Sequence, residues 1–332
     1  MTALAEQEPT TEQAAQPQAP SPQQLAKKLK QTMAAVRLAK SKWHLTKKLE
    51  RGQVNQAAEG FHADPRYIGA SKKLINSRND KYRACGAVLS EAREYWKSVT
   101  IPFPEDGVRL IRRDRMQQFA DTMQQFKQDL LAAAGALQGD YDAIREEARA
   151  RLGDLFCEHD YPADVACLFS LHWEYPSVEP PSYLMEADPT GKLYEQQVAL
   201  MEARFQEAIA LTEEAFTKSF RDMVEHLADR LKFGDVDPET GNRKPLVFKD
   251  SSIENLQSFF EQFKALNVGS SPDLDSLVSQ AQQIVGDKTA KDLRKDVTLR
   301  QNVQAGMAEI TAKLDALMVA RPIRQMNLLD EE

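Results

Sequence analysis

Two cysteines and two histidines lie close together in the middle of the chain, at Cys157, His159, Cys167 and His172. Thiolate and imidazole groups are the usual ligands of structural zinc, so the chemistry open to these residues is metal binding. Their spacing, C-x-H-x7-C-x4-H, lacks the tight, repeated ligand pairs of most zinc sites. Cys167 also lies within the apolar run VACLF, which is typical of a buried core thiol. We therefore predict a packed, aromatic-rich segment here, with no metal site and no cofactor.

Other residues that could support catalysis lack the surroundings that catalysis requires. The chain contains no nucleophile elbow, no phosphate-binding glycine loop and no dinucleotide-binding fingerprint. Adjacent carboxylates occur at Glu146-Glu147 and Glu213-Glu214, but both pairs fall on the polar faces of expected helices. We therefore predict that the protein is not an enzyme and has no catalytic residues.

The basic side chains are concentrated near the beginning of the chain. Residues 22–83 contain 15 Lys and Arg but only 4 Asp and Glu, while the whole chain has a net charge of −7. Cations for phosphates, interleaved with aromatic rings for stacking, are typical of nucleic-acid binding. The alternative is a basic face that is solvated or docks on the acidic helices of the same chain. The predicted nucleic-acid-binding residues are Lys27, Lys28, Lys30, Arg37, Lys40, Lys42, Trp43, Lys47, Lys48, Arg51, Lys72 and Lys73.

The end of the chain carries a short motif. Residues 325–329 read QMNLL and resemble the pentapeptide that binds the sliding clamp of bacterial replication. An extended peptide could place Leu328 and Leu329 in an apolar pocket while the Gln325 amide makes hydrogen bonds. The pattern prefers Leu at the second position and Phe at the last, so Met326 and Leu329 are variants of it. The alternative is a helix end that packs back on the core.

Apolar periodicity predicts helices along most of the chain. The positions Met116, Phe119, Met123, Phe126, Leu130, Ala133 and Leu137 alternate by three and four residues, which is the spacing of a coiled-coil seam. A second apolar stripe runs from Tyr194 to Leu231 with an eleven-residue repeat. Two long helices joined by a compact segment predict an antiparallel hairpin. The predicted fold class is therefore all-α, with a long, coiled-coil-like helical hairpin, a compact tip and smaller helical bundles.

Composition divides the chain into five parts. We expect a disordered tail over 1–21, a basic helical region over 22–100, and the long hairpin over 108–232 with its compact tip at 152–190. A C-terminal helical bundle over 233–320 and a flexible acidic tail over 321–332 complete the chain. The apolar runs are too short to cross a bilayer, and no signal peptide is visible. We therefore expect a protein of the cytoplasm of a bacterial host cell, with no membrane contact.

Several stretches resemble a family of unknown function that occurs in bacteria, plasmids and phages. They are GVRLIRRD at 107–114, the region of Tyr141, LGDLFCEHDYP at 152–162, the run FSLHWEYPSVEPP, and FKDSSIENLQSFFEQFKALNV at 248–268. The resemblance covers about residues 70–290. Some members of that family are encoded near MoxR-type AAA ATPases, so the resemblance implies an adaptor role or a partner role. It supplies no catalytic residues.

Three functions remain open on these grounds. The leading one is a non-enzymatic helical accessory or scaffold protein of a phage or mobile element that associates with DNA. The second is an adaptor or partner of a MoxR-type AAA ATPase, and the third is a structural oligomer assembled through the coiled-coil seams. The expected partners are accordingly a protein such as the sliding clamp, DNA, an AAA ATPase or further copies of the chain.

Overall fold

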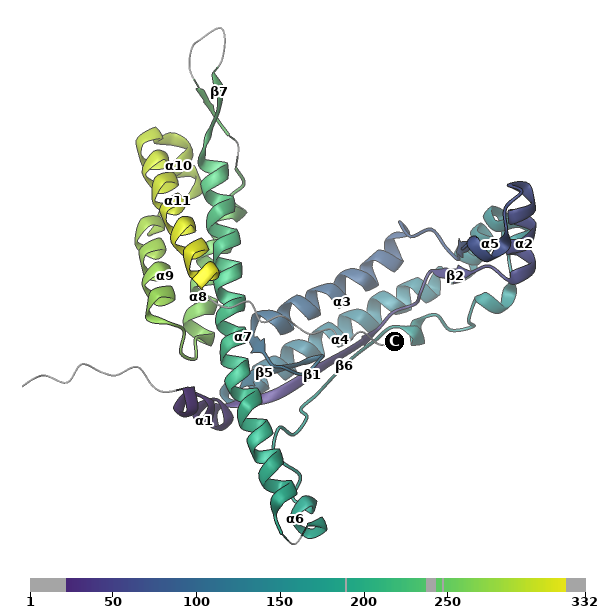
Figure 1. Ribbon diagram of the computed structural model, residues 1–332. Coiled ribbons are helices and arrows are strands. Elements are labelled where there is room, and N and C mark those ends of the chain that lie inside the picture. Colours follow the sequence, from purple (N-terminus) through teal and green to yellow (C-terminus); the bar gives the residue numbers. More distant parts are fainter. Residues whose placement is uncertain (1–21, 189, 237–242, 247, 321–332) are drawn as a thin grey trace, which may run out of the picture.

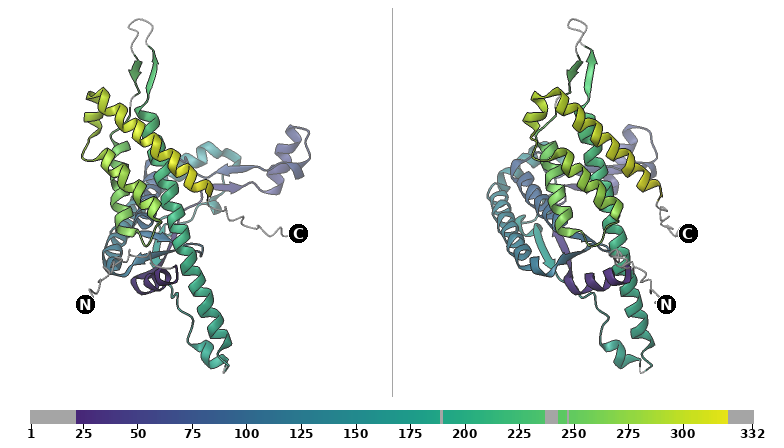
Figure 2. Two further views of the ribbon diagram at one scale, coloured as in Figure 1. Left: turned by 60° about the vertical axis from the view of Figure 1, so that its left-hand side comes forward. Right: turned by 90° about the vertical axis from the view of Figure 1, so that its left-hand side faces the viewer.

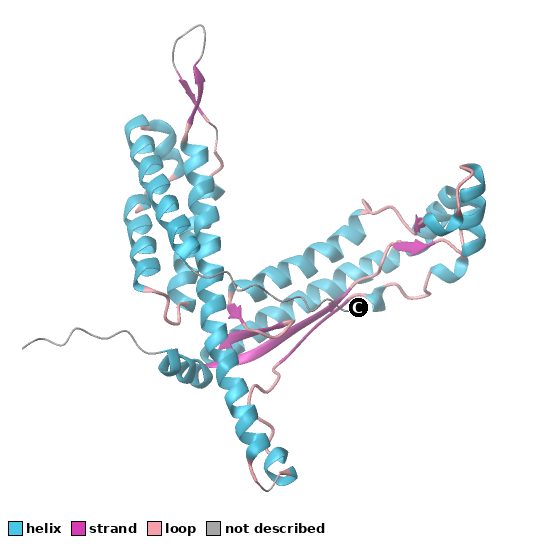
Figure 3. Cartoon of the chain, in the orientation of Figure 1, coloured by secondary structure: helices cyan, strands magenta, loops and turns pink. Residues whose placement is uncertain are grey.

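The computed structural model describes residues 22–188, 190–236, 243–246 and 248–320. A four-stranded antiparallel sheet lies at its centre, between an arm of helices and a separate stack of helices (Figures 1 and 3). The first part of the longest helix, α7 (Lys192–Leu231), extends beyond both, and the short helix α6 (Tyr183–Ala187) lies beside its tip (Figure 2). None of the helices in the described ranges combines the length and the apolar character that a membrane crossing requires.

The central sheet has the strand order β4-β5-β1-β6, formed by Thr100–Pro102, Val108–Arg112, Met33–Ser41 and Ser170–Glu174. The first part of β1 pairs with β5, from Met33↔Arg112, and the second part pairs with β6, from Arg37↔Glu174. The fold is thus mixed α and β, and the all-α prediction is wrong.

The error arises at β1, where the sequence pattern fits two structures. Leu25, Leu29, Met33 and Val36 have helical spacing, yet the helix α1 (Pro22–Thr32) ends before Met33. Met33 packs in one core and Val36 in the other, so β1 is buried on both faces. A strand that is buried on both faces shows no polar alternation, so periodicity alone cannot distinguish it from a helix.

The first core lies on one face of the sheet and joins α1 and α7 to α8 (Ser251–Leu266), α9 (Pro272–Val285), α10 (Ala290–Lys295) and α11 (Val297–Ala320). Aromatic rings fill its centre, where Phe220 of α7 stacks on Phe259 of α8 with ring centroids 5.2 Å apart. The part of the apolar stripe from Phe216 to Leu231 is therefore covered by C-terminal helices, α11 among them, whereas Leu193 and Leu200 in the first part of α7 are exposed.

The second core lies on the other face and builds the arm from α3 (Asp80–Ser98), α4 (Met116–Gly139) and α5 (Tyr141–Leu152). The predicted seam of α4 is buried here at Phe119, Met123, Leu130 and Leu137, and it packs against α3. The predicted hairpin between this helix and α7 is therefore wrong, because each of the two long helices pairs with a different partner. The buried part of the α4 seam is occupied within the chain and is not free to join two chains.

Smaller elements complete the molecule. The far end of the arm carries β2 (Thr46–Lys48), α2 (Arg51–Gly60) and β3 (Ser71–Lys73), and β2 pairs antiparallel with β3. The hairpin of β7 (Phe233–Val236) and β8 (Arg243–Pro245) follows the end of α7. The segment predicted as a compact tip contains short 3-10 turns, at Gly153–Leu155, Glu158–Asp160 and Ala166–Leu168, before it enters β6.

Candidate nucleic-acid interface

The structure separates the predicted basic residues into groups with different surroundings. Lys27, Lys28 and Lys30 lie on α1, which packs against α7 at the base of the sheet. The remaining predicted residues lie along β1 and in the far end of the arm. The α1 lysines and the arm lysines therefore belong to different surfaces (Figure 1).

Arg37 is engaged within the protein. Its guanidinium group lies 2.8 Å from Glu105 Oε1 and 2.9 Å from Glu174 Oε1. Arg204 of α7 approaches the other oxygen of Glu105 at 3.5 Å. Arg37 thus links the sheet to a neighbouring loop. Its two carboxylate partners already balance its charge, so it is a poor candidate for binding a phosphate.

Trp43 also has an internal role. Its side chain is buried, and its ring makes edge contacts with Tyr141 and Tyr161 at centroid distances of 5.9 and 6.4 Å. The hydroxyl group of Tyr82 donates a 2.9 Å hydrogen bond to the Trp43 carbonyl oxygen. Trp43 belongs to the second core and offers no surface on which a base could stack.

The hairpin of β2 and β3 sorts its four lysines into two pairs. Lys47 stands opposite Lys72, and the flanking pairs are Thr46↔Lys73 and Lys48↔Ser71. Because side chains alternate between the two faces of a sheet, Lys47 and Lys72 share one face while Lys48 and Lys73 share the other. The inward face thus carries Lys47 and Lys72, of which Lys72 is buried and Lys47 stays 53% exposed, while Lys48 and Lys73 face outward and are exposed.

The inward pair meets one buried carboxylate. Lys72 Nζ lies 2.6 Å from Asp160 Oδ2 and donates to the carbonyl oxygen of Leu155 at 2.6 Å, while Lys47 Nζ donates to Asp160 Oδ1. Burial alone raises the pKa of Asp160, but the two ammonium groups outweigh it, so this pKa lies below its ordinary value. The hydrogen bond to Asp160 in turn raises the pKa of Lys47. This cluster fixes the hairpin to the rest of the arm.

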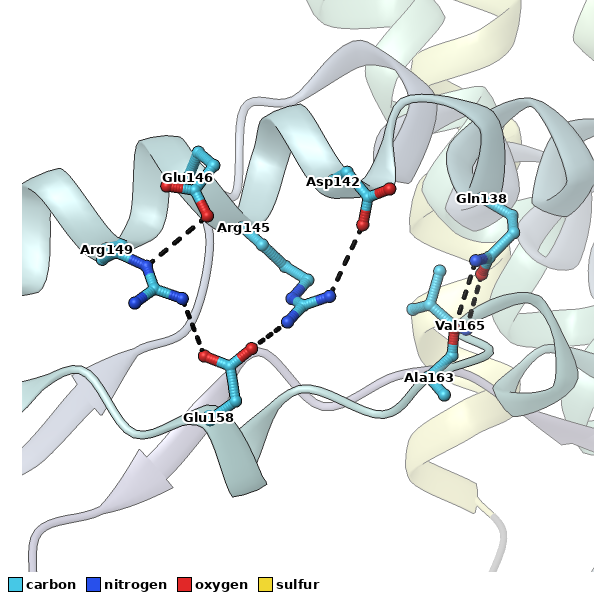
Figure 4. Close-up of polar contacts among 8 residues, drawn as sticks. All are labelled: Gln138, Asp142, Arg145, Glu146, Arg149, Glu158, Ala163 and Val165. Atoms are coloured by element: carbon cyan, nitrogen blue, oxygen red, sulfur yellow. Dashed lines mark hydrogen bonds and ion pairs between the residues drawn. The ribbon is translucent and has the colours of Figure 1, made fainter.

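The segment that carries Asp160 is itself held by polar contacts (Figure 4). Glu158 bridges Arg145 and Arg149 of α5, with a distance of 2.9 Å from Arg149 Nη2 to Glu158 Oε2. Gln138 of α4 accepts a 2.7 Å hydrogen bond from Val165 N and donates to the Ala163 carbonyl oxygen at 3.2 Å. These contacts hold the turns on either side of Asp160 against α4 and α5.

The outward-facing cations are uncommitted. Within the described ranges, none of these exposed side chains forms an ion pair: Lys40, Lys42, Lys48, Arg51 and Lys73. Burial, together with repulsion from Arg93, Lys42 and Lys97, lowers the pKa of Lys40. Arg93 and Lys97 thus add positive charge near Lys40, and Lys97 is itself paired with Glu94 at 3.0 Å. Sequence reasoning missed Arg93 and Lys97 because α3 brings them to β1 from outside residues 22–83.

Two exposed aromatic side chains lie beside these cations in the chain. Phe61 directly follows α2 and is 81% exposed, and Tyr67 ends the next 3-10 turn and is 88% exposed. Asp64 shapes the connection, since its side chain accepts a hydrogen bond from Arg66 N at 3.0 Å. Large exposed rings next to free cations are the combination that stacking on unpaired bases requires.

The four candidate zinc ligands do not form a site. Cys167 is exposed and its Sγ donates to the Asp164 carbonyl oxygen at 3.0 Å, so the expectation of a core thiol is wrong. His172 lies on β6, whereas His159 lies in the turn Glu158–Asp160. In the part of the chain that the structure describes, no three His, Cys, Asp or Glu side chains gather closely enough to hold a metal.

The predicted clamp-binding residues Gln325, Met326, Leu328 and Leu329 lie outside the described residues. The chain matches no protein-family model, and no curated protein and no solved structure is significantly similar to it. The resemblance to a family of unknown function therefore stays a prediction. The site must be interpreted from its own residues.

Proposed function

We propose that this chain is a non-enzymatic accessory protein that contacts DNA with the outward-facing side of its arm. The observation that carries the proposal is the division of the lysines in the β2–β3 hairpin. Lys47 and Lys72 both pair with Asp160, whose single negative charge offsets one of their two positive charges, whereas Lys48 and Lys73 face solvent with no ion pair in the described ranges. The separation follows from the pairing of the two strands, and it leaves Lys48 and Lys73 available to phosphates.

The charge around the outward face supports the same proposal. Lys40 near the end of β1 and Lys42 directly after it add two more cations without an ion pair among the described residues, and Arg51 adds one at the start of α2. Lysine and arginine side chains that neutralise phosphates release the counterions condensed on the nucleic acid. This release is the main source of affinity in non-specific nucleic-acid binding. The chain as a whole is acidic, so a basic arm also orients the molecule toward a polyanion.

The arm is rigid enough to present these charges at fixed spacing. The aromatic contacts of Trp43 and the Lys72–Asp160 pair tie the hairpin to the second core. A preorganised set of cations loses less conformational entropy on binding than a flexible tail of the same charge. The proposed association with a phage or mobile element depends on the family resemblance alone.

The test measures DNA binding as a function of salt concentration. We expect fluorescence anisotropy to show binding at low salt that weakens as salt is added. Lys48→Gln together with Arg51→Gln should lower the slope of log K against log salt by roughly two, because two phosphate contacts are lost.

The matched control removes the same charge elsewhere. Lys27→Gln together with Lys28→Gln changes α1 and should leave binding almost unchanged. Equal effects of the two double variants would contradict a specific role for the arm. Wild-type protein that binds no DNA at low salt would refute the proposal and favour an ATPase adaptor or a structural oligomer.

A further inference from the structure

A groove of about 460 Å³ lies at the far end of the arm, between α5 and the loop that leads from β3 into α3. Its volume falls in the range of sites that bind small organic groups. Lys73 lines it and also belongs to the outward face of the β2–β3 hairpin. The groove is therefore continuous with the proposed DNA-binding surface.

Five of the residues that line the groove are apolar, and we call them its floor, although polar atoms make up the larger share of the exposed lining. Ile144, Ala148 and Leu152 contribute from successive turns of α5, and Leu74 and Ile75 contribute from the opposite side. Leu74, Ile75, Ile144 and Ala148 are buried, so they form a firm surface. A flat aromatic group can pack on such a floor, whereas a phosphate gains nothing from it.

The rim of the groove is basic. Lys73, Arg78 and Arg151 line it together with one acid, Glu147, which already pairs with Arg151 at 2.6 Å. Lys73 and Arg78 form no ion pair with any residue that the structure describes. The rim thus carries two uncommitted cations at the mouth of an apolar recess.

Two asparagines add hydrogen-bond donors to the rim. The Oδ1 atom of Asn76 accepts from Arg78 N, and that of Asn79 accepts from Tyr82 N, both at 3.0 Å. The side-chain NH2 groups of Asn76 and Asn79 form no hydrogen bond with another described residue. Donors and cations around an apolar floor match the acceptors of a nucleotide, with its phosphate outside and its base inside.

The loop is held in place from behind. Tyr161 donates a 2.6 Å hydrogen bond to the Leu74 carbonyl oxygen, and Lys72 is anchored on Asp160. Because Lys72 points inward, its neighbour Lys73 must point outward toward the groove. The groove is therefore formed before any ligand arrives.

We propose that this groove binds one unstacked nucleotide of a single-stranded nucleic acid. The base packs on the floor formed by α5, and the adjoining phosphates lie against Lys73 and Arg78. A base inside a duplex is stacked and paired, so it would have to leave the helix to enter the groove. The arm therefore prefers single strands over duplexes. This inference rests on the proposed function, and it assigns a substrate class to the same surface.

The experiment compares a labelled single-stranded oligonucleotide with a duplex of the same length at one salt concentration. Ser77 lines the groove and is exposed, so Ser77→Trp fills the recess without changing charge. We expect it to weaken single-strand binding about tenfold, the order of one lost base-stacking contact. Duplex binding should change less than about twofold. Ser279 occupies an exposed position on α9, so Ser279→Trp is the matched control. It should change neither single-strand binding nor duplex binding.

A second variant tests the rim without adding bulk. Arg78→Gln should weaken single-strand binding more than Lys48→Gln, which removes one charge from the outward face. If the two variants act equally, or if Ser77→Trp weakens neither ligand or both alike, the groove is not a nucleotide site. In those cases DNA binding by the wild-type arm still stands. If the wild-type protein binds neither the single strand nor the duplex, the proposed function itself is refuted.

Discussion

Lys72 Nζ lies 2.6 Å from Asp160 Oδ2, and both side chains are almost completely buried, with exposed fractions of 6% and 2%. Lys47 occupies the other carboxylate oxygen from the neighbouring strand. One acid therefore joins two strands of the arm to a turn that lies far away in the sequence. This relationship decides which lysines remain available to a ligand.

Replacing Asp160 should loosen the arm. Asp160→Asn leaves the buried ammonium group of Lys72 without its counter-charge, so we expect a loss of about 3 kcal/mol in the free energy of unfolding. Urea denaturation measures this loss. Asp154→Asn is the control, because Asp154 is exposed in the same segment and should cost less than about 0.5 kcal/mol. Equal effects of the two variants would contradict a stabilising role for the buried pair.

The same carboxylate predicts a pH dependence. The pKa of Asp160 in the folded protein lies below the ordinary 3.8, since its two lysine partners outweigh the effect of burial. The stability that it contributes is therefore complete above about pH 5 and declines as pH falls through 3.8 toward the lower folded value. We expect the stability gap between wild type and Asp160→Asn to narrow over that interval. A gap that stays constant down to the acid transition would show that Asp160 is not stabilised in its charged form.

Trp43 and Phe61 should respond in opposite ways to truncation. Trp43 is 6% exposed, so Trp43→Ala should lower the free energy of unfolding by about 3–5 kcal/mol. Phe61 is 81% exposed, and Phe61→Ala should leave stability within about 0.5 kcal/mol but weaken binding to single-stranded DNA. Thermal melting and anisotropy separate the two effects. Trp43→Phe with full stability but no DNA binding would show that the indole contacts the ligand after all.

Two glycines should give stability changes of opposite sign. Gly269 has a φ of +116°, and a Cβ atom there would lie 2.7 Å from Leu25 Cδ1, so Gly269→Ala should cost about 1–3 kcal/mol. Gly135 lies within α4 with open space around it, so Gly135→Ala should add about 0.5–1 kcal/mol. Denaturant midpoints measure both changes, and the Gly269→Ala value tests the packing of α1 against the loop before α9. A neutral Gly269→Ala would show that this contact is loose.

The tail motif makes an independent prediction. Gln325→Ala together with Leu328→Ala should abolish binding to a bacterial sliding clamp while the melting temperature stays unchanged. A peptide that buries two leucines should bind in the micromolar range at best, because its ordering offsets much of about 1.5–3 kcal/mol per leucine. Calorimetry with the full chain measures the affinity. A melting temperature that falls by several degrees would place the tail in the core and contradict the docking role.

The sequence contained one signal for the pairing of β2 with β3, which the helical spacing of the neighbouring apolar residues obscured. Residues 46–49 read TKKL and residues 71–74 read SKKL, and the structure pairs these two segments as β2 and β3. The 21 residues between the two runs include α2, so the similarity of the runs hints at the pairing without predicting it as a short hairpin loop would. The inward and outward lysines follow from that pairing and could not be assigned without it.

The sequence by itself determined most of the helices. The apolar face of α8, from Ile253 to Leu266, is buried as its spacing predicts, and α9 lies between the cap at Ser271 and Gly286. These features depend on residues within one or two turns of each other, so local pattern is enough to locate them.

Only the tertiary structure decided which helices pair, that Met33–Ser41 is a strand, and which cations remain free. The partners of β1 lie in β5 and β6, and the partner of Lys47 lies 113 positions away at Asp160. Hydrogen bonds and charge pairs between such distant residues override local helical preference, because burial on both faces favours pairing with neighbouring strands. The far end of the arm is a candidate binding surface for the same reason, since Asp160 pairs with two lysines while the adjacent two stay exposed with no ion pair among the described residues.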